Sequence, residues 1–248
     1  MDARTRISGN IGSRHMRTFK LILIAFSIAA LFATGDVAAK SQGNLEHGPT
    51  VYNFGHVGID YTVYLEYELW NTGTRAVHII SAVPSCDCSF TTVKDTLIQP
   101  GDTGYVRLSY NTRNFYASTS QSFTITTDDP LEPQFKVYYQ SIVGQWIAGI
   151  KPNPLSVMFL PGQKPKVIAI DNTHFAEMSA EYIDQADTTF TVKFLSSEAN
   201  KGERIEMEIS PNHSLESGTY DSSYRIQVRV PAIEDPVILS IPVKVVVY

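Results

Sequence analysis

The sequence is poor in the residues from which catalytic and metal sites are usually built. Only two of its 248 residues are cysteine, which excludes a framework of several disulfides and a zinc site made of two Cys-x-x-Cys pairs. Its six histidines are scattered without ligand spacing, and it contains no Gly-x-Ser-x-Gly elbow, phosphate loop or His-Glu-x-x-His motif. We therefore predict a protein that is not an enzyme and that holds no cofactor.

Long apolar runs are missing apart from one near the amino terminus. There a basic stretch ending at Lys20 is followed by the apolar residues 21–32 and then by Val37-Ala38-Ala39. These are the three parts of a secretory signal peptide, and the apolar block is shorter than the about 20 residues of a membrane-spanning helix. We expect residues 1–39 to be removed by cleavage after Ala39, with Met16 as an alternative start. An uncleaved amino-terminal anchor is the alternative, and either form places the body outside the cytoplasm, in the periplasm or at the cell surface.

Excess positive charge is absent as well. The formal net charge at pH 7 is −5, and loss of residues 1–39 removes five basic and two acidic residues and brings it to −8. An acidic exported body lacks the basic surface that attracts nucleic acids and anionic lipids. We expect neither as a partner, and no membrane span once the leader is cleaved.

Helical periodicity is missing too, and apolar residues instead recur at every second position. In residues 61–70, Val63, Leu65, Tyr67 and Leu69 alternate with other side chains, which predicts a strand with one buried face. From residue 51 onward such segments are short and are separated by turn residues about every 8 to 12 positions, which is typical of an immunoglobulin-like β-sandwich. The predicted fold class is all-β.

The chain beyond the leader is long enough for two domains. Its 209 residues compare with about 100 to 150 in a typical domain. Glycines and prolines gather at residues 144–154, where we place the boundary. We predict a linker at residues 40–50, a first sandwich at 51–148 and a second at 149–248, with no sheet that continues from one to the other.

Three landmarks recur along the chain at a nearly constant offset, and fixed-period self-similarity is the mark of a duplicated unit. Phe54 recurs as Phe159 after 105 positions, Asn71-Thr72 as Asn172-Thr173 after 101, and Asp129-Pro130 as Asp235-Pro236 after 106. We therefore expect two tandem copies of one sandwich. The second copy contains no cysteine, so the fold itself does not require one.

The first copy carries several short motifs in order, namely Asn53-Phe54-Gly55, Asn71-Thr72-Gly73, Ser85-Cys86-Asp87-Cys88, Pro100-Gly101 and Thr126-Thr127-Asp128-Asp129-Pro130. Through them residues 51–144 resemble an exported bacterial family known as domain of unknown function 1573. The resemblance implies an immunoglobulin-like sandwich similar to the major-sperm-protein group, and export, but no activity. It marks Phe54, Gly55, Asn71, Gly73, Cys86, Cys88, Pro100 and Gly101. The chain departs from the family at Asp87, where glycine is usual.

Cys86 and Cys88 are the one place where the sequence offers chemistry. They follow the alternating residues 76–83, which we expect to bury Val77, Ile79 and Val83. Three interpretations stay open for the pair.

In the first, the cysteines form a disulfide, which an oxidising compartment permits and which requires the chain to bend from the about 6.6 Å of an extended strand. Such a bridge would stabilise the fold little and would be comparatively easy to reduce. In the second, the thiolates bind a soft ion such as Cu(I), with His56 or His78 as a third ligand. In the third, they are inert side chains at the rim of the sandwich.

Tyrosines and acidic pairs are the remaining candidates. Tyr64 and Tyr138 lie at outward positions of their strands, where exposed rings suit a contact with protein or glycan. Asp128-Asp129 lies at a predicted turn, where carboxylates accept backbone N–H groups.

Together these observations favour an exported, non-catalytic binding or structural protein that acts in adhesion or assembly at the cell envelope, with a protein or glycan as its partner. Sheet edges are the expected contact route, by addition of a strand. The alternative is a thiol-redox or copper-binding protein that uses Cys86 and Cys88.

Overall fold

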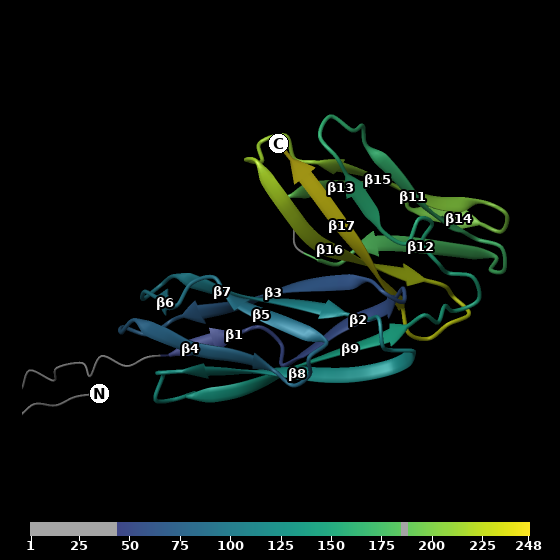
Figure 1. Cartoon of the computed structure of the whole chain (residues 1–248). Coiled ribbons are helices and arrows are strands. Elements are labelled where there is room, and N and C mark those ends of the chain that lie inside the picture. The colour runs from purple at the N-terminus through teal and green to yellow at the C-terminus, as the bar shows by residue number, and fades with distance from the viewer. Residues whose placement is uncertain (1–43, 185–187) are drawn as a thin grey trace, which may run out of the picture. The chain divides into compact units, whose positions relative to one another are not determined.

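A computed structural model describes residues 44–184 and 188–248 (Figure 1). Strands, turns and bends make up this part of the chain, so the all-β prediction is confirmed. None of its residues belongs to a helix that is long and apolar enough to cross a membrane. The predicted signal peptide and the alternative start at Met16 lie outside the described residues.

The first sandwich has two sheets, with strand orders β1-β3-β7-β5 and β2-β9-β8-β4-β6. Neighbouring strands pair antiparallel except β2 and β9, which are parallel. The bounds are β1 Leu45–His47, β2 Val51–Val57, β3 Thr62–Asn71, β4 Val77–Pro84, β5 Ser89–Val93, β6 Leu97–Ile98, β7 Thr103–Asn111, β8 Ala117–Thr127 and β9 Gln134–Val143.

The second sandwich repeats this plan with sheets ordered β11-β15-β13 and β14-β12-β16-β17, and β10 pairs in parallel with β17. The bounds are β10 Val157–Phe159, β11 Lys166–Asp171, β12 Glu177–Tyr182, β13 Phe190–Ser196, β14 Glu198–Asn200, β15 Arg204–Pro211, β16 Gly218–Arg229 and β17 Val237–Val247.

Each sandwich has a hydrophobic core of its own, formed where the inward side chains of its two sheets meet. In β3 the four predicted core residues, Val63, Leu65, Tyr67 and Leu69, are all buried. Full burial of such a side chain stabilises the fold by about 1.5 to 3 kcal/mol. The prediction of two sandwiches is confirmed, whereas the boundary between residues 148 and 149 stays a prediction.

The predicted burial of one residue was wrong. Val83 is 57% exposed, although Val77 and Ile79 on the same strand are buried as expected. The cause is a β-bulge, since Ile79 lies opposite Thr127 but Ser81 lies opposite the adjacent Thr126. The extra residue in β4 reverses the alternation of side chains, and Val83 therefore turns outward.

The predicted linker at residues 40–50 contains a strand. β1 pairs with β3, and Leu45 in it is buried. The Leu45 N–H donates to the carboxylate of Asp129 at 2.7 Å, and Asp129 is itself fully buried. Three residues are too few to show a period of two, so contacts with distant residues decide the structure here.

The duplicated Asn71 and Asn172 make the same bonds in both copies. Each is buried and donates from its side-chain amide to a backbone carbonyl of the following short strand, β6 in the first copy and β14 in the second, at 2.9 Å. The backbone carbonyl of each accepts the N–H of a glycine with positive φ, Gly101 (φ 84°) or Gly202 (φ 89°). The repeat in the sequence is therefore a repeat of the same turn. In both copies the turn brings backbone carbonyls to the buried asparagine amide, which must be hydrogen-bonded.

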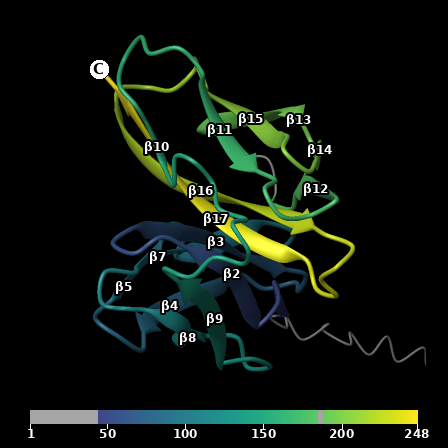
Figure 2. The ribbon, with the colours of Figure 1, turned by 90° about the vertical axis from the view of Figure 1, so that its right-hand side faces the viewer.

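The larger sheets of the two sandwiches are joined, and the expected break between them was wrong. Leu239 of β17 pairs in parallel with His56 of β2, so the strand order runs through both sandwiches (Figures 1 and 2). Beside this pair, the Ser240 hydroxyl donates to the carbonyl of Phe54 at 2.5 Å. Both sandwiches belong to one compact unit. We call the contact between β2 and β17 the seam.

Gly55 makes the seam possible. Its φ is +66°, which favours glycine, and a Cβ atom there would lie 2.2 Å from the carbonyl oxygen of Ile238 in β17. A larger residue would force the two backbones apart. The same glycine lies at a register shift between β2 and β9, so one residue bends β2 toward β17 and keeps it paired with β9.

Arg225 of β16 reaches across the seam to β2, held in place by an ion pair within the second sandwich. Its guanidinium lies 2.7 Å from the Asp184 carboxylate, and it donates to the carbonyl of Asn53 at 2.8 Å. It also covers the Tyr52 ring, 3.9 Å from the ring centroid. The side chains of Arg225 and Asp184 are each only 17% exposed, so solvent screens this ion pair weakly.

Candidate functional site

The Cys-x-Cys stretch is the crossover that takes the chain from β4 in the larger sheet to β5 in the smaller one. Ser85, at its start, is anchored on β8, since its N–H donates to the Ser122 carbonyl at 2.8 Å and its hydroxyl accepts the Ser122 N–H at 3.0 Å. Cys88, at its end, is anchored on β7 because its carbonyl accepts the Asn111 N–H at 2.9 Å. Only three residues lie between Ser85 and β5, so the chain must turn within them.

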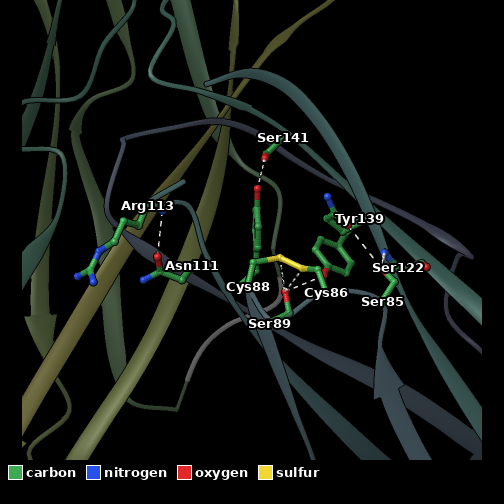
Figure 3. Close-up of a disulfide and its surroundings, with 11 residues drawn as sticks. Ser85, Cys86, Cys88, Ser89, Asn111, Arg113, Ser122, Tyr139 and Ser141 are labelled. Atoms are coloured by element: carbon green, nitrogen blue, oxygen red, sulfur yellow. Dashed lines mark hydrogen bonds between the residues drawn. A yellow bond between two sulfur atoms is a disulfide. The ribbon is translucent and has the colours of Figure 1, made fainter. Parts of the chain in front are cut away.

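Cys86 and Cys88 form a disulfide across this turn (Figure 3). Their Cα atoms are 5.2 Å apart, inside the range of about 4.4 to 6.8 Å that disulfides span. The turn is closed by the Ser89 N–H, which donates to the Cys86 carbonyl at 3.3 Å. Asp87 has a negative φ, so the position does not need the glycine that is usual in the resembled family.

The hydroxyl group of Ser89 lies beside both sulfurs and links them to Tyr139. The Ser89 Oγ lies 3.6 Å from the Cys88 Sγ, 3.9 Å from the Cys86 Sγ and 2.6 Å from the Tyr139 hydroxyl (Figure 3). Tyr139 is buried, and burial raises its pKa, opposed by the hydrogen bond with Ser89 and supported by the neighbouring Tyr110. Tyr139 is therefore a neutral phenol at pH 7, and the crossover is tied to the core through uncharged groups.

This arrangement supports thiol–disulfide exchange. Both cysteines are half-buried, so part of the bridge remains within reach of solvent. An incoming thiolate is the nucleophile that opens such a bond. The Ser89 hydroxyl, held by the Tyr139 hydroxyl, contacts both sulfurs, and both groups are neutral. Copper binding would require the two cysteines in their reduced form.

The histidines considered as third metal ligands lie in other places. His56 is buried in the seam, with Nδ1 2.7 Å from the Gln145 carbonyl. His78 is exposed and lies beside Asp128 on the far end of β4. Among residues 44–184 and 188–248, no three His, Cys, Asp or Glu side chains are grouped so that they could hold a metal ion.

The acidic pair Asp128-Asp129 accepts backbone N–H groups, as expected of a turn. Asp129 accepts those of Leu45 and Leu131, and Asp128 accepts that of His78 at 2.7 Å and pairs with Arg75 at 3.1 Å. Partial burial would raise the pKa of Asp128, but hydrogen bonds from the His78 amide, the Arg75 guanidinium and the His78 ring outweigh it and lower the pKa. The pair therefore holds the β8–β9 hairpin to β1 and β4.

Tyr64 and Tyr138 were both predicted to have exposed side chains. Tyr138 is exposed, whereas Tyr64 is partly buried. Tyr64 lies under the Arg107 guanidinium, which is 4.8 Å from its ring centroid, and its backbone bonds the Ser223 hydroxyl of β16 in both directions at 2.9 Å. Arg107 in turn contacts Glu66 at 3.1 Å and donates to the carbonyl of Asp221.

A cavity of about 340 Å³ opens beside this group, and sequence reasoning missed it. It is lined by Tyr64, Phe90, Thr92, Arg107 and Ser109 of the first sandwich and by residues 189 and 219–221 of the second. One hint was present in the sequence, an outward Glu66 that could pair with Arg107 on the neighbouring strand. The residues of β16 that complete the cavity lie more than a hundred positions after Arg107 in the chain, so their approach could not be predicted.

Residues 45–143 match the model of a family described as a protein of unknown function, DUF1573. The first sandwich is a DUF1573 domain. The match begins with the first residue of β1 and ends with the last residue of β9, so it covers this sandwich from end to end.

Most marked residues of the DUF1573 domain have structural roles. Phe54 is buried in the core, Gly55 admits β17, and Asn71 and Gly101 form the turn that recurs in the second sandwich. The disulfide of the DUF1573 domain has no such counterpart among the described residues of the second sandwich, which contains no cysteine.

No curated protein matches the sequence. Among solved structures, a protein of unknown function from Porphyromonas gingivalis W83 is 12% identical over 82% of this chain and 99% of its own, with a TM-score of 0.31. The YadV chaperone is 10% identical over 80% and 98%, with a TM-score of 0.31. PapD-like domain 7 of human CEP192 is 13% identical over 54% and 100%, with a TM-score of 0.34.

Proposed function

We propose that this chain is an exported, non-catalytic binding or structural protein that acts in adhesion or assembly at the cell envelope. The observation that carries the proposal is the edge of the smaller sheet in the DUF1573 domain. β5 pairs with β7 on one side, and no strand of the described chain pairs with its other side. An uncovered edge is a template for another chain, and strand addition to such edges is a recurrent way in which proteins bind.

Export is supported by the leader pattern in residues 1–39 and by the acidic charge of the remaining body. The test is to recover the protein from the cells that make it, fractionate them and measure its intact mass. We expect an envelope or extracellular protein that begins at Lys40. A cytoplasmic protein that retains Met1 or Met16 contradicts the proposal, and an envelope protein that retains its leader supports the anchored form instead.

The binding role is tested with the protein in the envelope. Photo-crosslinking residues placed on β5 are expected to capture an envelope protein or glycan, while the same residues placed on exposed Met158 in β10 capture nothing in common with them. Equal capture from both positions, or turnover of a substrate by the purified protein, argues against a binding function.

A thiol-redox role is a second candidate, supported by the half-exposed disulfide beside Ser89. It predicts that the purified protein accelerates the reduction of insulin by dithiothreitol and that Cys86→Ser abolishes this activity. The Met158→Ala variant, which changes an exposed residue of the second sandwich and keeps both sulfurs and Ser89, is the control. If Cys86→Ser and the unchanged protein give the same rate as buffer, the redox role is lost.

A further inference from the structure

Among the described strands, β5 lacks the protective features that mark the other sheet edges, and its only bond to the neighbouring β4 that we find is the side-chain bond from Thr91 to the Ala82 carbonyl. Natural proteins cover edges, shorten them, place charges on them or interrupt them with bulges. β1, β6 and β14 are only two or three residues long, and β11 is bridged by Asn153. β13, the counterpart of β5, carries Lys193 and has a register shift between Phe194 and Ser196. β5 runs through Ser-Phe-Thr-Thr-Val with no charge and no shift in its pairing.

The backbone groups that β5 offers to a partner follow from its pairing with β7. The Asn111 N–H donates to the Cys88 carbonyl and the Lys94 N–H to the Tyr105 carbonyl, so even-numbered residues bond β7. In an antiparallel ladder the alternate residues point their N–H and C=O groups the other way. Thr91 and Val93 therefore direct theirs away from the sheet.

The side chains of β5 place the same edge against the cavity of about 340 Å³. Phe90 and Thr92 lie on the outer face of the sheet and line it, and the Phe90 side chain is one of the most exposed large apolar groups, at 69%. Side chains at directly opposite positions of neighbouring strands share a face. Residues of an added strand opposite Phe90 and Thr92 would thus project toward this cavity.

The charges around the cavity are already paired. Arg107 contacts Glu66 and the Asp221 carbonyl and covers the Tyr64 ring, and the Asp221 carboxylate pairs with Lys244 at 3.1 Å. Aromatic rings of Tyr64, Phe90 and Tyr220 and hydroxyls make up most of the rest of the lining. Such a lining suits an uncharged aromatic side chain, which gains ring contacts without leaving a charge unpaired.

We propose that β5 binds an extended segment of a partner polypeptide as an additional strand, and that an uncharged aromatic side chain of this segment enters the cavity between Phe90, Tyr64 and Tyr220. The inference rests on the proposed binding function and names the class of its partner. Backbone bonds from Thr91 and Val93 supply affinity, and the cavity supplies selectivity.

The test selects random twelve-residue peptides displayed on phage against the purified protein in the form that the cell holds. Enriched peptides are expected to carry an aromatic residue flanked at alternate positions by β-branched residues. A synthetic copy is expected to slow hydrogen exchange at the Thr91 and Val93 amides, measured by NMR. Enrichment of no peptide on the unchanged protein overturns the proposal.

Two matched pairs of variants locate the contact. Thr91→Pro removes the outward N–H at an edge position that tolerates proline, and Thr91→Val keeps this N–H while losing the side-chain bond to the Ala82 carbonyl. Phe90→Ala removes a wall of the cavity, and Tyr116→Ala removes a ring of nearly equal exposure, 67%, elsewhere. We expect Thr91→Pro and Phe90→Ala to weaken peptide binding at least tenfold, and Thr91→Val and Tyr116→Ala to leave it within twofold.

Equal binding by Thr91→Pro and Thr91→Val overturns the site even where an envelope partner is captured, which leaves the proposed function standing. Sedimentation that shows a dimer of this chain, lost in Thr91→Pro, also overturns it, because β5 would then pair with a second copy. A cytoplasmic location or substrate turnover defeats the proposed function independently of the peptide result.

Discussion

At the scale of single residues, the crossover at Cys86 and Cys88 is held from several sides. Ser85 is bonded to β8, Cys88 to β7, and Ser89 to the buried Tyr139. The disulfide joins residues only two apart and so removes little freedom from the unfolded chain. The surrounding bonds, more than the covalent one, keep this turn in place.

The double variant Cys86→Ser with Cys88→Ser is therefore expected to fold. Chain entropy for so small a ring gives a loss of about 1 to 2 kcal/mol in the free energy of unfolding. Urea denaturation measures it, with Asn71→Ala as a comparison that leaves two backbone carbonyls without their donor and should cost more. A double variant that is unfolded at 25 °C would mean that the bridge, not its surroundings, shapes the turn.

Asp128 gives the protein a measurable pH dependence. Because its folded pKa is lowered, the stability it contributes is present above its unfolded pKa of about 3.9 and is lost as pH falls through the folded value. Asp128→Asn should be less stable than the unchanged protein at pH 6 by an amount below about 1 kcal/mol, because the group is partly exposed. This difference should shrink as pH falls below the unfolded pKa and Asp128 is protonated in the folded state too. A constant difference across that range, measured by thermal unfolding, would show that charge is not its cause.

At the scale of elements, the period of two was a good guide to long strands and a poor one to short strands and irregularities. β3 buries the residues that alternation predicts, and its partner β7 shows the same alternation, since the two strands pair without a shift. β1 and β6 were missed because two or three residues carry no period, and Val83 was misplaced because the bulge at Ile80 leaves no mark in the sequence. The disulfide was one of three open interpretations, and the anchors on Ser122 and Asn111 that permit it come from distant strands.

Gly55 and Gly101 separate two effects of a glycine. Both have positive φ, but a Cβ at Gly55 meets the Ile238 carbonyl oxygen whereas one at Gly101 meets nothing within 4 Å. Gly101→Ala should cost about 1 to 2 kcal/mol through backbone strain alone. Gly55→Ala should cost about 3 kcal/mol or more because β2 and β17 must move apart. Equal losses in urea denaturation would argue against close packing at the seam.

At the scale of the whole molecule, the seam lay beyond what the sequence predicts. The sequence gives two copies and a boundary, but the partners in the seam, such as Phe54 with Ser240 and Asn53 with Arg225, are 186 and 172 positions apart. No local pattern reports contacts of that separation. The cavity beside β5 was missed for the same reason, because each sandwich supplies only part of its lining.

Arg225 tests how strongly the sandwiches depend on each other. Arg225→Met removes the cationic partner of Asp184 at low exposure and leaves its carboxylate only the hydrogen bonds from the Tyr52 hydroxyl and the residue 225 N–H. We expect a loss of about 2 to 3 kcal/mol and two separate transitions in calorimetry. Arg204→Met, whose pair with Asp171 is more than half exposed, should cost under about 1 kcal/mol and leave one transition. A single unchanged transition in Arg225→Met would show that backbone pairing alone couples the two sandwiches.

β17 follows every other described strand in chain order, and yet it borders β16, β10 and β2 at once. During synthesis these three strands leave the ribosome first, and their backbone N–H and C=O groups that pair with β17 have no partner until residues 237–247 follow. A chain that ends before this point lacks the strand that borders both sandwiches, so β16, β10 and β2 keep backbone groups without partners. Proteases and chaperones that recognise exposed strand backbone would thus distinguish truncated from full-length copies at this one step.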